Sequence, residues 1–191
     1  MQYNKTIMDT TKSIEIIEGM LQESRKSLHR NSFYFILWGL LMAPAGIIES
    51  SFIDTKNSWM VWPIAGMLGG IISTIYSKKE AQRSGVQTAI DRITKYTWGA
   101  FGFALLFGIA FSIFNQLLPH SLVLLIAGFA TFITGGITKF KPFIYGGIAL
   151  ELGAIACAFF VPPSLQGFVF AISISLGYIV PGFILKKSEN G

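Results

Sequence analysis

Glu151 is the residue of this chain that is most costly to place where the sequence puts it. It stands in the middle of an apolar run, residues 142–161, where a carboxylate costs roughly 2.5–3.5 kcal/mol if the run crosses a membrane. Small residues share its helical face, since Gly147 lies four positions before it and Ala154 and Ala158 lie three and seven after it. We therefore expect Glu151 to face another helix or water.

Two roles for Glu151 remain open. In one, its carboxylate couples the movement of protons or cations across a membrane. In the other, a protonated Glu151 is structural and donates a hydrogen bond to a hydroxyl of a neighbouring helix. The candidate members of this intramembrane polar site, besides Glu151, are Thr131, Thr134, Ser173 and Ser175.

A second acidic residue, Glu49, stands near the end of the first apolar run, close to Ser50 and Asp54. We expect it to be solvated at the membrane interface. Asn115 and Gln116 end the third apolar run at the same predicted level. Together with Glu49 they are candidates for a polar outer vestibule.

Motifs for enzyme chemistry are scarce. The two histidines, His29 and His120, are predicted to lie on opposite sides of the membrane, with His120 in an outer loop. The one cysteine, Cys157, cannot pair within the chain. The sequence contains no HExxH, no GxSxG and no phosphate-binding glycine loop. We therefore predict no enzyme activity, no metal and no cofactor.

The elements that position these residues follow from composition. The chain has 191 residues, of which 52% are hydrophobic and 13% are charged, about half the charge of an average soluble domain. Six apolar runs are each long enough to cross a hydrocarbon core roughly 30 Å thick as a helix. They are Phe33–Ile53, Trp59–Ser77, Thr97–Leu117, Leu122–Thr138, Pro142–Val161 and Gly167–Leu185. We predict an all-α polytopic membrane protein, with six transmembrane helices arranged as three hairpins.

Lysine and arginine predict the orientation of these hairpins. Of the 15 basic residues, all except Lys56 fall on one side of the predicted membrane. Because basic residues stay in the cytoplasm, both termini are expected there. This pattern also explains the net charge of +5 without a nucleic-acid partner, and it makes the lipid bilayer the expected partner.

The segment 1–30 is predicted to be cytoplasmic and to contain an amphipathic helix over 9–30. This helix lies along the membrane or docks a protein partner. Its apolar face consists of Ile14, Ile17, Leu21 and Leu28. The transmembrane domain covers 31–187, with a cytoplasmic loop at 78–95 that holds a second short interfacial helix, and 188–191 form a short tail.

Small residues recur at a spacing of four within the apolar runs, as in the pair Gly66 and Gly70. Such spacing lets helix backbones approach closely in lipid, either within the chain or between copies in a homo-oligomer. Among the prolines of the spans, Pro44 is the one expected to kink its helix, because Gly46 follows it.

Four stretches of sequence resemble those of small, uncharacterised six-span membrane proteins of Gram-negative bacteria. They are NSFYFILWG at 31–39, WMVWPIAG at 59–66, GGITKFKP at 135–142 and YIVPG at 178–182. The resemblance covers nearly the whole chain. It implies a six-helix fold in the bacterial inner membrane and brings no activity or site residues with it.

Two functional classes remain. The favoured one is a non-catalytic membrane subunit with a cytoplasmic partner or a lipid-facing surface, since topology and packing explain most features of the sequence. The alternative is a small transporter or channel-like protein that uses Glu151 for proton or cation coupling.

Overall fold

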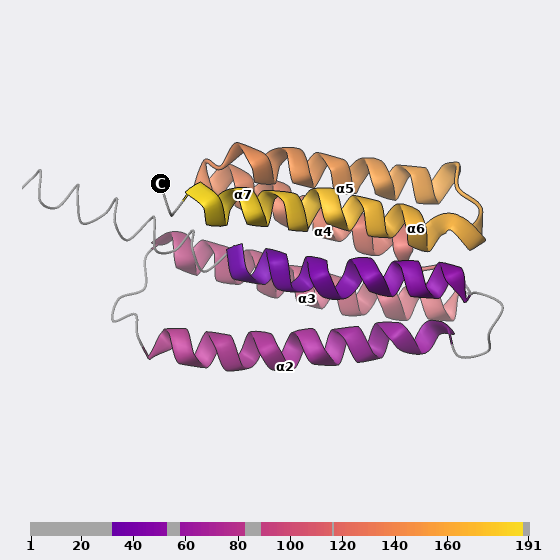
Figure 1. The fold of residues 1–191 in the computed structure, drawn as a ribbon, viewed down its shortest axis with the longest axis horizontal. Coiled ribbons are helices and arrows are strands. Elements are labelled where there is room, and N and C mark those ends of the chain that lie inside the picture. Colours follow the sequence, from indigo (N-terminus) through magenta and orange to yellow (C-terminus); the bar gives the residue numbers. More distant parts are fainter. Residues whose placement is uncertain (1–31, 53–57, 83–88, 116, 189–191) are drawn as a thin grey trace, which may run out of the picture.

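The computed structural model describes residues 32–52, 58–82, 89–115 and 117–188 (Figure 1). The predicted amphipathic segment 1–30, with Ile14, Ile17, Leu21 and Leu28, lies outside the described residues. The described part of the chain is all-helical and contains six helices long and apolar enough to cross a membrane. The prediction of an all-α protein with six membrane-length helices is therefore confirmed.

The six helices lie side by side, with their long axes roughly parallel (Figure 1). The first helix is Ser32–Ser51, and the second is α2 (Val61–Ala81), preceded by the short turn η1 (Ser58–Met60). The next three are α3 (Ala89–Phe114), α4 (His120–Thr138) and α5 (Lys141–Phe159). The sixth is built from α6 (Pro163–Ile174), η2 (Ser175–Ile179) and α7 (Val180–Ser188).

One predicted boundary is wrong. Helix α3 begins at Ala89, eight residues before the predicted start of the third span at Thr97. The loop predicted over 78–95 is therefore much shorter, and residues from Ala89 onward form the first turns of α3 rather than a separate interfacial helix. Because these turns contain polar side chains, they are not part of an apolar run, and hydropathy alone does not predict them as helix.

Helices α4 and α5 are held together by glycine. A Cβ atom at Gly128 would lie 3.1 Å from the Gly147 carbonyl oxygen, and one at Gly135 would lie 2.7 Å from the Ile144 backbone nitrogen. The two backbones thus approach to a distance that no side chain would permit. Lipid provides no hydrophobic drive between helices, so this close van der Waals contact is what favours their association.

The sixth helix is the centre of the bundle, and half of its most apolar window is buried. On one side Gly177 of η2 lies against Gly146 of α5, and on the other Gly167 of α6 lies against Gly46 of the first helix. Phe143 and Phe170, both almost completely buried, fill the spaces between these contacts.

A π-helical turn, η2, interrupts the sixth helix just before Pro181. Proline has no N–H to offer the carbonyl group four residues earlier, and its ring clashes with that carbonyl. The helix widens in response, so that the Val180 N–H bonds to the Ser175 oxygen five residues back. The first helix also contains a proline, Pro44, and it is continuous through this residue; the kink expected there stays a prediction.

Helices α2 and α3 are peripheral. Only 11% of the most apolar window of each is buried, against 33–50% for the other four helices. Helix α2 contacts the first helix where Trp38 covers Gly69 and where Phe33 stacks on Tyr76 at 3.8 Å. Most of its remaining surface faces away from the rest of the chain.

The glycine contact between α4 and α5 predicts opposite outcomes for two adjacent residues. Gly135→Ala should lower the free energy of unfolding by about 1–3 kcal/mol, because the added methyl group meets backbone atoms of α5. Gly136→Ala, where the methyl group meets nothing within 4 Å, should be neutral or slightly stabilising. Thermal unfolding in detergent, followed by tryptophan fluorescence, measures both. Equal melting temperatures for the two variants would contradict the backbone contact.

Candidate functional site

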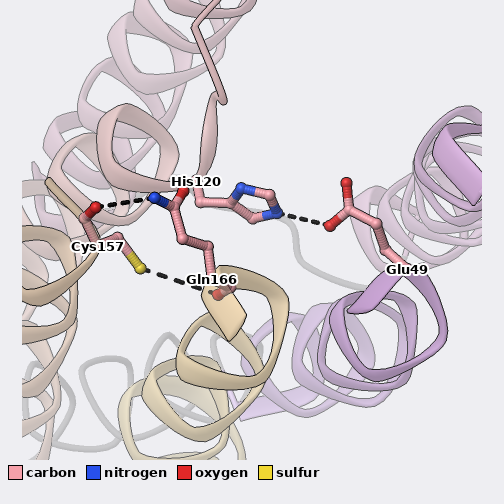
Figure 2. Close-up of polar contacts among 4 residues, drawn as sticks. All are labelled: Glu49, His120, Cys157 and Gln166. Atoms are coloured by element: carbon pink, nitrogen blue, oxygen red, sulfur yellow. Dashed lines mark hydrogen bonds and ion pairs between the residues drawn. The ribbon is translucent and has the colours of Figure 1, made fainter. Parts of the chain in front are cut away.

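A buried ion pair joins the first helix to α4 at one end of the bundle. The Nε2 atom of His120 lies 2.6 Å from the Oε2 atom of Glu49, and the two side chains are 2% and 14% exposed. Figure 2 shows the imidazole and the carboxylate pointing toward one another from their two helices. The distance is at the short end of the range for hydrogen bonds between charged groups.

Aromatic rings and a glycine contact enclose this pair. The edges of Trp62 from α2 and Phe170 from α6 meet the imidazole of His120, with ring centroids 5.6 and 5.8 Å away. A Cβ atom at Gly167 would lie 3.2 Å from the Glu49 carboxylate, so only glycine lets α6 approach this closely. Four helices therefore meet around one ion pair.

Several polar atoms beside the pair are buried and, within the described part of the chain, make no hydrogen bond. They are His120 Nδ1, Ser50 Oγ and Trp62 Nε1. Trp62 Nε1 lies near the Glu49 carboxylate without the geometry of a regular hydrogen bond. Among the residues that the structure describes, no hydroxyl is bonded to either nitrogen of His120, so these residues do not form a nucleophile–histidine–acid triad. The hydrogen bond between Nε2 of His120 and Oε2 of Glu49 ties α4 to the first helix.

The end of α5 is fixed next to this site by Gln166 of α6. Its side-chain amide donates hydrogen bonds to the carbonyl oxygens of Cys157 and Val161 at 3.0 and 3.2 Å. These carbonyls belong to the last turn of α5 and the residues after it, where no helical N–H is left to bond them. Figure 2 shows this contact beside the Cys157 thiol, which points back toward the Gln166 carbonyl.

Glu151 lies at the interface of α5 with α4, where its Cγ atom covers Gly128. It is partly exposed on the outside of the bundle. Within the described residues its carboxyl group makes no hydrogen bond or ion pair. The expectation that Glu151 contacts a neighbouring helix agrees with this position, although its other side is open.

Three of the four hydroxyl groups predicted to surround Glu151 are bonded to their own helices. Thr131 donates to the Ala127 carbonyl and Thr134 to the Ala130 carbonyl, both at 2.7 Å. Ser175 donates to the Ala171 carbonyl at 2.7 Å. Ser173 is buried on α6 against Gly153 of α5. The structure thus gives these four residues roles in helix packing and does not bond any of them to Glu151.

The prediction for Glu49 needs a correction. It was expected to be solvated, and it is instead mostly buried and paired with His120. Asn115 does not join it, since this exposed side chain donates to the Phe111 carbonyl of its own helix at 2.8 Å. Gln116 lies outside the described residues. His120, expected in an outer loop, is the first residue of α4 and is buried.

Sequence reasoning missed the ion pair although a signal existed. The sequence predicts Glu49 near the outer end of its span and His120 in an outer loop on the same side of the membrane, and each is costly to bury alone. Two such residues predicted on the same side of the membrane are candidates to pair, even when many positions separate them in the sequence. Here that separation is 71 positions. In the described residues, no group of three metal-ligating side chains comes together at this site or elsewhere.

Comparison with known proteins adds no relative: no family model matches the chain, and no curated protein or solved structure is significantly similar to it.

The ion pair predicts a strong energetic coupling between two helices. Glu49→Ala and His120→Ala should each lower the free energy of unfolding by about 3–5 kcal/mol, because each leaves a buried polar partner unpaired. The double variant should lose less than the sum, by about 1–3 kcal/mol. Thermal or denaturant unfolding in detergent measures the full cycle.

Asn115→Ala is the matched control, since its amide bonds only within its own helix end. Its effect should stay within about 0.5 kcal/mol. Additive losses in the cycle would mean that Glu49 and His120 do not stabilise one another.

Proposed function

We propose that this chain is a non-catalytic subunit of the bacterial inner membrane that binds a transmembrane helix of another chain through α2 and α3. Its six helices cross the bilayer as three hairpins, and both termini lie in the cytoplasm. Charge supports this orientation, because hairpins would bring every described lysine and arginine to one face of the membrane. These residues are Lys78, Lys79, Arg92, Lys95, Lys139, Lys141, Lys186 and Lys187.

The observation that carries the proposal is the division of the glycines into two classes. In α4, α5 and the sixth helix, nearly every glycine lies against another helix of the same chain. On α2 and α3, by contrast, a Cβ atom would meet nothing within 4 Å at four positions: Gly66, Gly70, Gly99 and Gly102. Glycine inside a helix costs about 1 kcal/mol relative to alanine. In lipid it is used where backbones approach closely, so these open glycines favour a partner from outside the chain.

The interior of the bundle supports a role without catalysis. Leu124, Phe143 and Leu150 are fully buried at its centre, and glycine contacts bring the surrounding backbones together. The hydroxyls of Thr131 and Thr134 are buried and bonded to their own helix. The sequence also predicts a cytoplasmic helix with Ile14 and Leu21 on its apolar face. Its role as a second docking surface stays a prediction.

The partner-binding face predicts the effect of bulky residues on α2. The double substitution Gly66→Ile and Gly70→Ile should abolish association, because two branched side chains would separate the helix backbones. Particle mass, measured by light scattering in polymer-bounded native discs, should fall to that of one 21.0 kDa chain plus lipid. In the unaltered protein it should include a second chain, whether a copy of this one or another protein.

Gly136→Ile is the matched control, since Gly136 on α4 is equally open and lies outside α2 and α3. It should leave the particle mass unchanged. A single-chain particle before any substitution would overturn the proposal.

A second candidate function rests on Glu151. Its carboxyl group is partly exposed and, in the described residues, unpaired. An unpaired acid at the middle of a span is a functional candidate by default, which supports a small transporter coupled to protons or cations.

Proton flux into liposomes, reported by an internal pH dye, separates the two functions. A transporter should dissipate an imposed pH gradient in the presence of its coupled cation, with sodium and potassium as the first two probes. Glu151→Gln, which keeps the shape of the side chain, should reduce that flux to the level of empty liposomes. If the unaltered protein, the Glu151→Gln variant and empty liposomes all give the same proton flux, the transporter function is excluded and the non-catalytic function remains.

A further inference from the structure

A groove between the first helix and the end of α2 has the chemistry of an anion site. The groove is shallow and open to its surroundings, with a volume of about 490 Å³. Tyr34 lines one wall, and Ser73, Thr74, Ser77 and Lys78 line the other. Three hydroxyl groups of α2 and one ammonium group thus face a single space, with no carboxylate among the lining residues.

Several hydrogen-bond donors of this groove are not used within the described part of the chain. Ser73 Oγ is buried and, among the described residues, has no partner. Thr74 uses its hydroxyl hydrogen on the Gly70 carbonyl at 2.8 Å, which leaves the donors of Ser73, Ser77 and Lys78. Ser73 and Ser77 are four positions apart, as are Thr74 and Lys78, so the four residues form two neighbouring rows along α2, and all four line the groove. A buried hydroxyl without a partner costs free energy that a bound phosphate oxygen would recover.

We propose that this groove binds the phosphate group of an anionic phospholipid. The surface next to it explains why the phosphate would belong to a lipid. On the face of α2 that carries Thr74 and Lys78, the preceding residues at spacings of three and four are Ile71 and Met67. Both are exposed, and they offer an apolar track for acyl chains. The tyrosine ring of Tyr76, stacked on Phe33, lies at the level where aromatic side chains gather at membrane interfaces.

The location also fits the distribution of anionic lipids. Basic pockets between transmembrane helices on the cytoplasmic side bind anionic headgroups, and Lys78 belongs to the end of the bundle that the proposed orientation places in the cytoplasm. The inference uses this orientation and does not depend on a partner for α2 and α3. A failure of the lipid site would therefore leave the proposed association untouched, and the reverse also holds.

Native mass spectrometry of the delipidated full chain tests the site. The probes are phosphatidylglycerol and phosphatidylcholine with identical acyl chains, each titrated in detergent, and inorganic phosphate as a competitor. The first phosphatidylglycerol should bind at least fivefold more tightly than phosphatidylcholine. Lys78→Met should weaken that preference about fivefold, the contribution of one lysine near an anionic surface.

Two further variants make the result specific. Lys79→Met removes the adjacent charge, which does not line the groove, and should leave the preference nearly unchanged. The pair Ser73→Ala and Ser77→Ala should weaken binding of both lipids, because both carry the phosphate that the hydroxyls bond. All variants lie at or near the helix surface, and an unchanged melting temperature shows that they fold.

Three outcomes would overturn the proposal. If Lys79→Met acts as strongly as Lys78→Met, the attraction is that of the whole basic surface and not of the groove. If millimolar inorganic phosphate displaces the lipid completely, the site binds a free anion. If the unaltered chain binds both lipids equally, the groove does not select anionic headgroups.

Discussion

Contact between helix backbones at glycine is the interaction on which the rest of this structure depends. Apolar helices gain little by leaving lipid for one another, so a bundle in a bilayer needs close packing to hold it together. Here a chain of such contacts runs from Gly128 and Gly147 to Gly146 and Gly177, which links α4 to α5 and then to the sixth helix. Gly46 and Gly167 continue it to the first helix. Helices α2 and α3 stand outside this chain of contacts.

Two carboxylates, those of Glu49 and Glu151, lie beside such contacts, and their surroundings differ. Glu49 lies against Gly167 at one end of the bundle and has a histidine partner. Glu151 lies against Gly128 near the middle of α5 and is partly open on its other side. The first arrangement satisfies a buried acid inside the chain. The second leaves an acid for which the described residues offer no partner, and this is the reason that transport stays a second candidate.

The number and kind of helices could be predicted from the sequence, because the length and apolar content of each run decide both. A run of about 20 apolar residues has few alternatives to a helix in lipid. The start of α3 could not be predicted in this way, because polar residues such as Arg92 and Lys95 occupy helical turns that precede the apolar run. The burial of Glu49 could not be predicted either, because burial depends on which helix covers a residue.

The ion pair could be predicted only in part. Its two members stand at the same predicted membrane level, yet whether they meet depends on how the first helix and α4 are rotated about their axes. The contact between Gly46 and Gly167 orients the first helix against α6, and it has no signature in the sequence beyond a glycine in each helix. The predicted cluster around Glu151 failed to form hydrogen bonds for a related reason: Thr131 and Thr134 can bond their own backbone at no cost in geometry.

The π-helical turn before Pro181 amounts to one residue added to an otherwise regular helix. An α-helix turns by about 100° for each residue, so without the extra residue everything after η2 would face a different neighbour. Gly182 and Leu185 would turn away from the first helix and the core that they now contact, and Lys186 and Lys187 would project in other directions. The widened turn therefore sets the rotational phase of the C-terminal end of the chain.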